Sequence, residues 1–276
     1  MKTKIDQLLA KVDRVLDRCL ADDTDVTDFA RHRAFRWDGA CRALTPISRP
    51  VHIHPDRLLG IDAIKHEVLR NTKSFVHGGK ANNILLWGER GTGKSSLIKS
   101  LLTAFNKTPL RMIQVYRHDI LSITSLYDMI AGHRSYRCIL FIDDLSFEES
   151  QTDYKEMKTI MDGGIEDIPD NILFYATSNR KHLIPTRFSD NASDEIRPSD
   201  TVEEKISLAD RFGLSFGFYH FSEETYLKIA AFYAAEYGVP ATGKQLERMA
   251  IRWALEAGSQ NGRTAEQFAK NAAVKD

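Results

Sequence analysis

The sequence predicts an α/β fold with a parallel sheet, a helical extension before it and a helical region after it. Short apolar runs alternate with amphipathic segments from residue 81 onward. Runs that are apolar on both faces are typical of strands covered by helices on both sides. Alternation of strands and helices favours a parallel sheet of right-handed crossover units. The expected strands are NILLW (83–87), MIQVY (112–116), CILFI (138–142), ILFYATS (172–178) and SFGFYHF (215–221).

The segment before the first expected strand divides into two parts. Residues 3–20 place apolar side chains at helical spacing, which predicts a helix that packs on the core or joins a partner. Residues 34–55 contain several prolines and a glycine, so we expect a connector there. A further helix is expected over 62–73. This pattern predicts an extension and connector at 1–55 and an α/β core at 56–221.

The remainder of the chain, residues 222–276, is predicted to be a separate helical domain. Ser222 is a natural helix cap, and the helix that follows it is expected to end at Gly238. Helices over 244–257 and 265–273 follow.

Composition limits the range of functions. The 38 lysines and arginines balance the 38 aspartates and glutamates, so no overall charge attracts nucleic acid or an anionic membrane. The sequence starts without an apolar signal core and contains no apolar stretch long enough to cross a bilayer. Cys19, Cys41 and Cys138 show no metal-ligand spacing. We therefore expect a cytoplasmic protein with reduced thiols; a Cys19–Cys41 disulfide is the less favoured alternative.

A phosphate-binding loop is the strongest motif of the chain. Gly88-x-x-x-x-Gly93-Lys94-Ser95 follows an expected strand and opens an expected helix, the context that this motif requires. Glycines let backbone N–H groups approach phosphates, and the helix N-terminus adds partial positive charge. Lys94 is suited to the β- and γ-phosphates and the Ser95 hydroxyl to Mg²⁺. The expected nucleotide-binding residues are Gly88, Glu89, Arg90, Gly91, Thr92, Gly93, Lys94, Ser95 and Ser96.

Polar residues end two further strands of the expected sheet. Asp143 and Asp144 follow CILFI, where a P-loop protein needs an acid that supports Mg²⁺. Asp143 is the predicted metal-supporting acid, and Asp144 is then placed to activate the attacking water. The alternative is that the pair caps a helix. Asn179, after Thr177 and Ser178, can hold this water or sense the γ-phosphate, although Ser-Asn is also favourable turn chemistry.

These parts, in this order, resemble the AAA+ ATPases. LLWGERGTGKSSL, FIDDLSF and YATSNRKHLIP are similar to a bacterial AAA+ family classed as a domain of unknown function, over roughly residues 33–269. The resemblance implies binding and hydrolysis of Mg²⁺-ATP by a homo-oligomer, such as a ring, that acts on an unknown protein or nucleic acid. It also implies a C-terminal helical lid over the P-loop core.

The resemblance also assigns further site residues. Asn179 matches the first sensor, Arg211 in LADRFGLSF the arginine finger, and Arg263 in GRTAEQF the second sensor. The purine-facing segment is LLGID, with Leu59, Gly60 and Ile61. An ion pair with a nearby carboxylate is the alternative for Arg211, and a solvated side chain is the alternative for Arg263.

Two departures from the family pattern bear on activity. Most AAA+ hydrolases carry Asp-Glu where this chain has Asp-Asp, which implies slow or partner-gated hydrolysis, or a substitute base at Glu148. No aromatic-apolar-glycine loop follows 112–116, which makes polypeptide threading a less favoured function. Arg187 and Arg197 are the alternatives to Arg211 as the arginine finger. Because the Asp-Asp pair favours slow hydrolysis, a nucleotide-switched scaffold with little turnover is the alternative function.

Two weaker patterns complete the survey. Four arginines (33, 36, 42 and 49) flank Phe35 and Trp37, which suits a nucleic-acid backbone, although interleaved aspartates favour a mixed solvated face. His52 and His54 lack further ligands at metal spacing, and we expect them on the surface.

Overall fold

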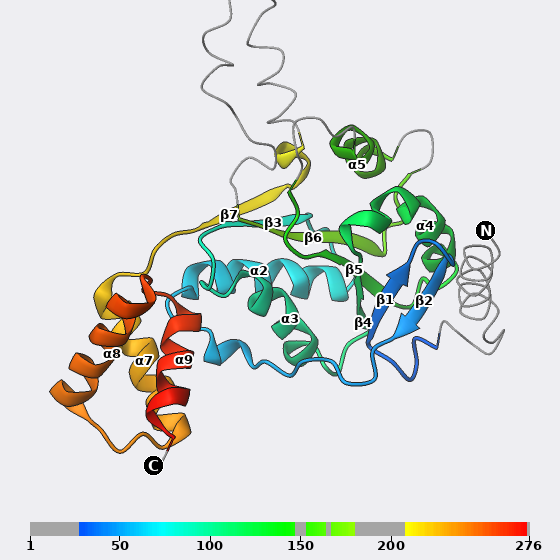
Figure 1. The fold of residues 1–276 in the computed structure, drawn as a ribbon. Helices are drawn as coiled ribbons and strands as arrows, with labels where there is room; N and C mark the ends of the chain where they lie inside the picture. The colour runs from blue at the N-terminus through cyan, green and yellow to red at the C-terminus, as the bar shows by residue number, and fades with distance from the viewer. Residues whose placement is uncertain (1–27, 147–152, 164–166, 180–207, 275–276) are drawn as a thin grey trace, which may run out of the picture.

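The computed structural model describes residues 28–146, 153–163, 167–179 and 208–274 (Figure 1). The predicted helix at 3–20 lies outside these residues. Within them, one seven-stranded sheet has the order β2-β1-β4-β5-β6-β3-β7, and only β2 runs antiparallel to its neighbour. The strands are β1 Ala34–Asp38, β2 Ala43–Pro46, β3 Ile84–Gly88, β4 Leu110–Gln114, β5 Arg137–Ile142, β6 Ile172–Ser178 and β7 Leu214–Phe218.

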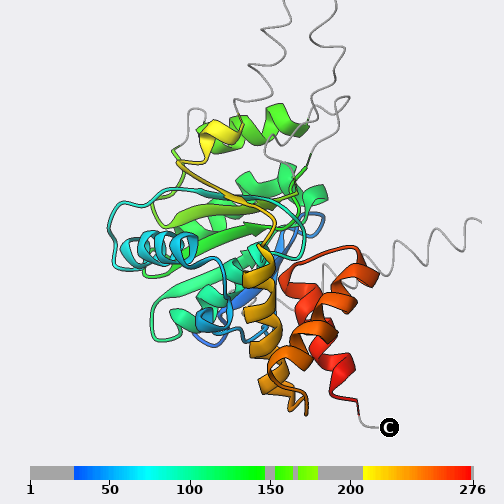
Figure 2. The same ribbon diagram turned by 90° about the vertical axis from the view of Figure 1, so that its left-hand side faces the viewer.

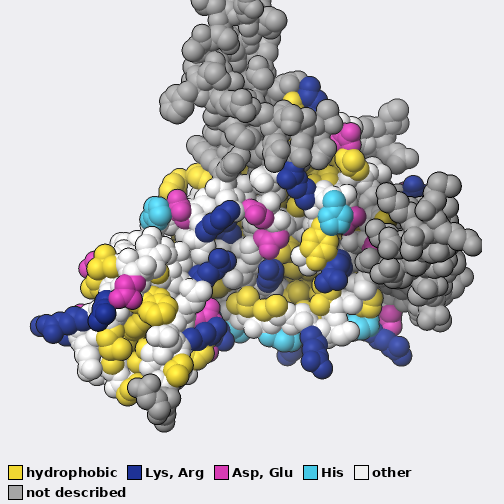
Figure 3. Space-filling view, viewed as in Figure 1, with side chains coloured by type: hydrophobic (Ala, Val, Ile, Leu, Met, Phe, Trp, Pro, Cys, Tyr) yellow, Lys and Arg dark blue, Asp and Glu magenta, His cyan; other side chains and the backbone are white. Residues whose placement is uncertain are grey.

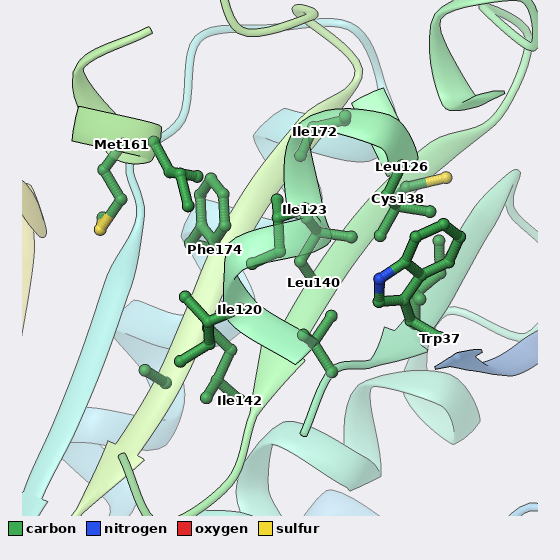
Figure 4. Close-up of a cluster of buried hydrophobic side chains, with 14 of the residues drawn as sticks. Trp37, Ile120, Ile123, Leu126, Cys138, Leu140, Ile142, Met161, Ile172 and Phe174 are labelled. Carbon is green, nitrogen blue, oxygen red and sulfur yellow. The ribbon is translucent and has the colours of Figure 1, made fainter. Parts of the chain in front are cut away.

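Helices cover both faces of this sheet, as the doubly apolar strands predict. Along β5, Ile139 and Phe141 join the core under α2 and α3, whereas Leu140 and Ile142 join the core under α4 and α5. The second cluster is shown in Figure 4, where Leu140 and Phe174 lie beside Ile123 of α4. The helices of this layer structure are α2 Asp62–Val76, α3 Lys94–Ala104, α4 Ile123–Ala131 and α5 Asp153–Asp162, with short 3-10 turns η1 Pro55–Arg57, η2 Arg117–Ser122 and η4 Ala209–Arg211.

The prediction of a connector over residues 34–55 is wrong in its first half. Residues 34–46 form a hairpin, and β1 pairs in parallel with β4. Phe35 and Trp37 are fully buried while Arg36 between them is exposed, which is the period-two pattern of a strand. Gly39 falls in the turn and the prolines fall at or after the end of β2, so they do not interrupt pairing. The sheet therefore begins well before the expected boundary at residue 56.

The cysteines divide between two chemical states. Cys138 is free and buried, and its burial raises the pKa of the thiol to about 12. Cys41 is disulfide-bonded, which corrects the expectation of a reduced thiol at this position. Cys19, the partner considered in the sequence, lies outside the described residues.

The C-terminal helices pack around a small core of their own, beside the sheet (Figures 1 and 2). They are α7 Glu223–Tyr237, α8 Gly243–Ala257 and α9 Gly262–Ala272. The Ser222 hydroxyl accepts a hydrogen bond from the Thr225 N–H, and Gly238 ends α7 in a left-handed conformation, as predicted. No helix in the described part of the chain has the length and apolar character needed to span a membrane.

Candidate functional site

The glycine-rich loop joins the end of β3 to the start of α3. Gly88 has φ +118°, and a Cβ at this position would lie 2.0 Å from the Phe218 carbonyl oxygen, so only glycine fits against β7. The Glu89 N–H donates to the same oxygen at 2.8 Å. Packing against β7 thus holds the start of the loop next to the sheet, and the loop ends at the N-terminus of α3.

Lys94 turns back over this loop. Its Nζ donates to the carbonyl oxygens of Gly88, at 2.7 Å, and Glu89, at 2.6 Å. Burial lowers the pKa of Lys94, although the nearby carboxylates of Asp144, Glu89 and Asp143 oppose this effect. Both of these acceptors are neutral carbonyl oxygens, and an anionic ligand in the loop would be a stronger partner for the ammonium group.

Asp143 is the centre of a hydrogen-bonded group at the end of β5. Its Oδ1 accepts from the hydroxyls of Ser95, at 2.6 Å, and Thr177, at 2.7 Å, while Oδ2 lies 3.4 Å from Lys99 Nζ. Burial opposes ionisation of this carboxyl, but the hydroxyls and Lys99 outweigh it and lower the pKa of Asp143. An ionised carboxylate beside a serine hydroxyl is an oxygen donor set that fits Mg²⁺ held together with phosphates.

Asp144 has a left-handed backbone, with φ +57°, which is uncommon for a residue other than glycine. Its N–H donates to Thr177 Oγ1 at 2.9 Å, and its carboxylate accepts from Asn179 Nδ2 at 2.6 Å. Thr177 therefore contacts both acids. The sequence pattern assigns Thr177 no role of its own. What could have indicated one is its position at the end of β6, because β6 pairs in parallel with β5, which carries the two acids.

These groups line one cavity of about 460 Å³. It lies between the phosphate loop and the C-terminal helices. In Figure 3, which has the viewpoint of Figure 1, cationic and acidic side chains lie next to one another near the centre of the molecule. The predicted site residues in its lining are Leu59, Ile61, Arg90, Gly91, Thr92, Gly93, Lys94, Ser95, Ser96, Asp143, Asp144, Asn179 and Arg263. Gly60, Gly88, Glu89 and Arg211 do not line it. Among the described residues, no group of three or more His, Cys, Asp and Glu forms a preassembled metal site.

Comparison with known proteins agrees with this geometry. The model of the family described as "Protein of unknown function (DUF815)" matches residues 30–276. The chain belongs to this family. A search of curated proteins finds no match.

Two solved structures show the fold. The Thermotoga maritima RuvB Holliday junction branch migration motor superposes with a TM-score of 0.54 at 17% identity, over 79% of this chain and 63% of that one. A mutant of the same protein gives 0.54 at 16% identity, over 79% and 64%. The chain thus spans less than two thirds of these structures. These comparisons confirm the predicted AAA+ type of fold and the predicted membership of a family of unknown function.

The helical side of the cavity contains residues that the sequence did not indicate. Arg57 of η1 forms hydrogen bonds of 2.5 and 2.6 Å with both carboxylate oxygens of Glu236 on α7. Tyr233 and Ile229 of α7 line the cavity on this side. No sequence pattern connects Arg57 with α7, because Arg57 and Glu236 are 179 residues apart in the chain.

The N-terminus of α9 contacts the phosphate loop directly. The Arg263 N–H donates to the Gly91 carbonyl oxygen at 3.3 Å, and Asn261 caps α9 by accepting from the Thr264 N–H at 2.9 Å. A Cβ on Gly91, which has φ +76°, would lie 2.5 Å from the Asn261 side chain. The loop and the helical domain are therefore in close contact at this glycine.

Arg211 lies away from the cavity of its own chain. It forms an ion pair with Asp162 of α5, in which Nη2 donates to Oδ2 at 3.1 Å and Nε contacts Oδ1. It precedes β7, whereas the phosphate loop touches the other end of β7 at Phe218. The ion pair that the sequence left open is present in this chain. Glu148, Arg187 and Arg197, the other residues considered, lie outside the described residues.

Proposed function

We propose that this AAA+ protein binds and hydrolyses Mg²⁺-ATP to rearrange or regulate a macromolecular partner in the cytoplasm. The observation that carries the proposal is the 2.6 Å hydrogen bond between Ser95 and the ionised Asp143, inside the cavity that Lys94 also lines. This is the combination of hydroxyl, acid and ammonium that a P-loop enzyme uses for a metal-bound triphosphate. The RuvB structure is described as a motor, which supports a mechanical use of ATP.

Each side chain has a distinct role in this proposal. Lys94 would exchange its carbonyl partners for phosphate oxygens, and Ser95 and Asp143 would hold Mg²⁺, which would neutralise phosphate charge. Asp144 accepts a proton from the attacking water, which Asn179 orients. The bound nucleotide supplies the phosphoanhydride bond that is cleaved. Leu59 and Ile61, which line the cavity, face the purine; Gly60, which does not line it, joins the two.

Two arginines and the domain arrangement complete the proposed enzyme. Arg263, at the start of α9, stabilises phosphate charge from within the same chain. Arg211 does so from a neighbouring copy, so turnover needs a homo-oligomer. Residues 222–276 act as a lid on the core, which residues 56–221 form together with the β1–β2 hairpin.

A nucleotide-switched scaffold is the second candidate, and one contact favours it. Asn179 Nδ2 lies 2.6 Å from the Asp144 carboxylate and engages the group that would activate water. Aspartate is also one methylene shorter than the glutamate usual at this position. A protein in this state would bind ATP without turning it over.

The test is steady-state ATP hydrolysis per subunit as a function of protein concentration, with ATP binding measured in parallel. Lys94→Ala is the blank, and Lys107→Ala, an exposed lysine just after α3, is the matched control. A rate that rises with concentration and then saturates supports an assembled enzyme. A flat rate near the blank with tight ATP binding supports the scaffold. Unchanged ATP binding by Lys94→Ala would contradict the phosphate-loop assignment on which both depend.

A further inference from the structure

Two cations lie over aromatic rings at the edge of the sheet that carries the nucleotide cavity. The Arg36 guanidinium lies 5.7 Å from the ring centre of Tyr116, and Lys99 Nζ lies 5.7 Å from that of Phe141. Residue 36 of β1 pairs with Gln114 of β4, which pairs with Phe141 of β5, so these positions share one face of the sheet. Figure 3 shows several lysine and arginine side chains gathered on the face in view. Lys99 is already paired with a carboxylate, because its Nζ lies 3.4 Å from Asp143 Oδ2, and the Phe141 ring beneath it is buried. The Arg36–Tyr116 pair is therefore the one that a ligand can reach.

Tyr116 also belongs to a pair of stacked rings that reaches solvent. Tyr116 and His118 have ring centres 5.6 Å apart and planes that differ by 10°. Tyr116 is 37% exposed, and the His118 side chain is 78% exposed. The 3-10 turn η2 has three residues per turn, which brings Leu121, itself 52% exposed, to the same side as His118. Three side chains of aromatic or apolar character therefore face solvent together.

Hydrogen bonds to β1 and its turn anchor this loop. Trp37 Nε1 donates to Ser122 Oγ at 2.7 Å, and the Gly39 N–H donates to Asp119 Oδ1 at 3.1 Å. Both partners belong to the segment that presents Tyr116 and His118. The rings are thus held in place before any ligand arrives, which reduces the entropy lost on binding.

We propose that the surface formed by Arg36, Tyr116 and His118 binds single-stranded nucleic acid. A stack of rings with an exposed outer member, here His118, beside a cation is a combination that holds single strands, because a base stacks on the rings and a phosphate pairs with the cation. Within the described part of the chain, Arg36 has no carboxylate partner, so its charge is available to a phosphate. A duplex keeps its base faces stacked inside, and a polypeptide has no regular row of anions.

This inference differs from the nucleic-acid pattern considered in the sequence. Phe35 and Trp37, the aromatic residues next to the arginines, are buried and cannot stack on bases. The Arg33 guanidinium donates to the carbonyl oxygens of Leu102 and Phe105. The ring beside Arg36 instead comes from Tyr116. The inference goes beyond the proposed ATPase function and does not depend on ATP turnover.

The test is fluorescence anisotropy with a labelled oligothymidylate of about 20 nucleotides, longer than the roughly 4–16 that one comparable site covers. It is run with and without a slowly hydrolysed ATP analogue, between about 50 and 200 mM salt. We expect Tyr116→Ala to weaken binding about 5- to 150-fold through loss of one stacked base. We expect Arg36→Ala to reduce the slope of log affinity against log salt by about 0.7.

Matched variants distinguish this surface from a general loss of structure. Tyr116→Phe keeps the ring and should retain binding. Tyr219→Ala, at an exposed aromatic residue after β7, should bind like wild type. No binding in either nucleotide condition would overturn the proposal, as would equal losses in Tyr116→Ala and Tyr219→Ala. Tyr116-dependent binding of labelled unfolded casein, with none of the oligonucleotide, would assign the surface to polypeptide instead.

Discussion

Replacing Thr177 with valine tests the hydrogen-bonded group that joins the two acids. The Thr177 hydroxyl is buried, donates to Asp143 at 2.7 Å and accepts from the Asp144 N–H at 2.9 Å. Valine has nearly the same shape but neither function. A hydrogen bond to a charged group contributes about 1.5–3 kcal/mol, and the partly buried bond from the Asp144 N–H contributes about 0.5–1.5 kcal/mol. Because the two effects overlap, we expect a destabilisation of about 2–4 kcal/mol at pH 7, or a melting temperature lower by roughly 4 °C or more.

The pH dependence of this loss identifies its cause. The pKa of Asp143 is lowered in the folded protein, so its ionised form contributes stability in full above about pH 4, the unfolded value for aspartate. This contribution disappears as pH falls through the lower, folded pKa. The difference between wild type and Thr177→Val, followed by thermal unfolding, should therefore shrink below about pH 4.

Thr159→Val, at an exposed helical threonine whose hydroxyl donates to the Lys155 carbonyl, is the control and should change stability by less than about 0.5 kcal/mol. A Thr177→Val protein as stable as this control would refute the reasoning. A loss that is the same at pH 7 and pH 3 would refute the part assigned to Asp143.

Two further predictions concern the oligomer and the lid. Arg211→Ala should leave ATP binding intact and reduce turnover by about 10³-fold or more, as loss of an arginine finger does. The control Arg252→Ala, at an exposed helical ion pair, should have no effect in the same hydrolysis assay. Full turnover in Arg211→Ala would move the proposed finger to another arginine. Gly91→Ala should weaken ATP binding more than Gly258→Ala does in calorimetric titration, because both replace a left-handed glycine but only a Cβ at Gly91 meets Asn261. Equal affinities in the two glycine variants would contradict the contact between loop and lid.

Sequence analysis located the elements whose signal lies in contiguous residues. Strand β3, the loop from Gly88 to Ser95 and the acids after β5 follow local rules of periodicity, glycine spacing and chain order. The hairpin at 34–46 was missed because nearby prolines and a glycine obscured the alternation of buried and exposed side chains over the five residues of β1. This strand also pairs with β4, which is distant in the sequence.

The sequence alone therefore predicted the α/β fold class, the glycine-rich loop and the order of the acids, because each depends on neighbouring residues whose chemistry is sufficient to recognise it. The AAA+ type came from the family resemblance of these motifs. Only the tertiary structure placed Thr177 between Asp143 and Asp144 and brought Arg36 over Tyr116. Those contacts join residues that are distant in the chain, and strand register sets them. A one-residue shift in the pairing of β1 or β6 would turn each side chain to the opposite face of the sheet, and no local pattern encodes that choice.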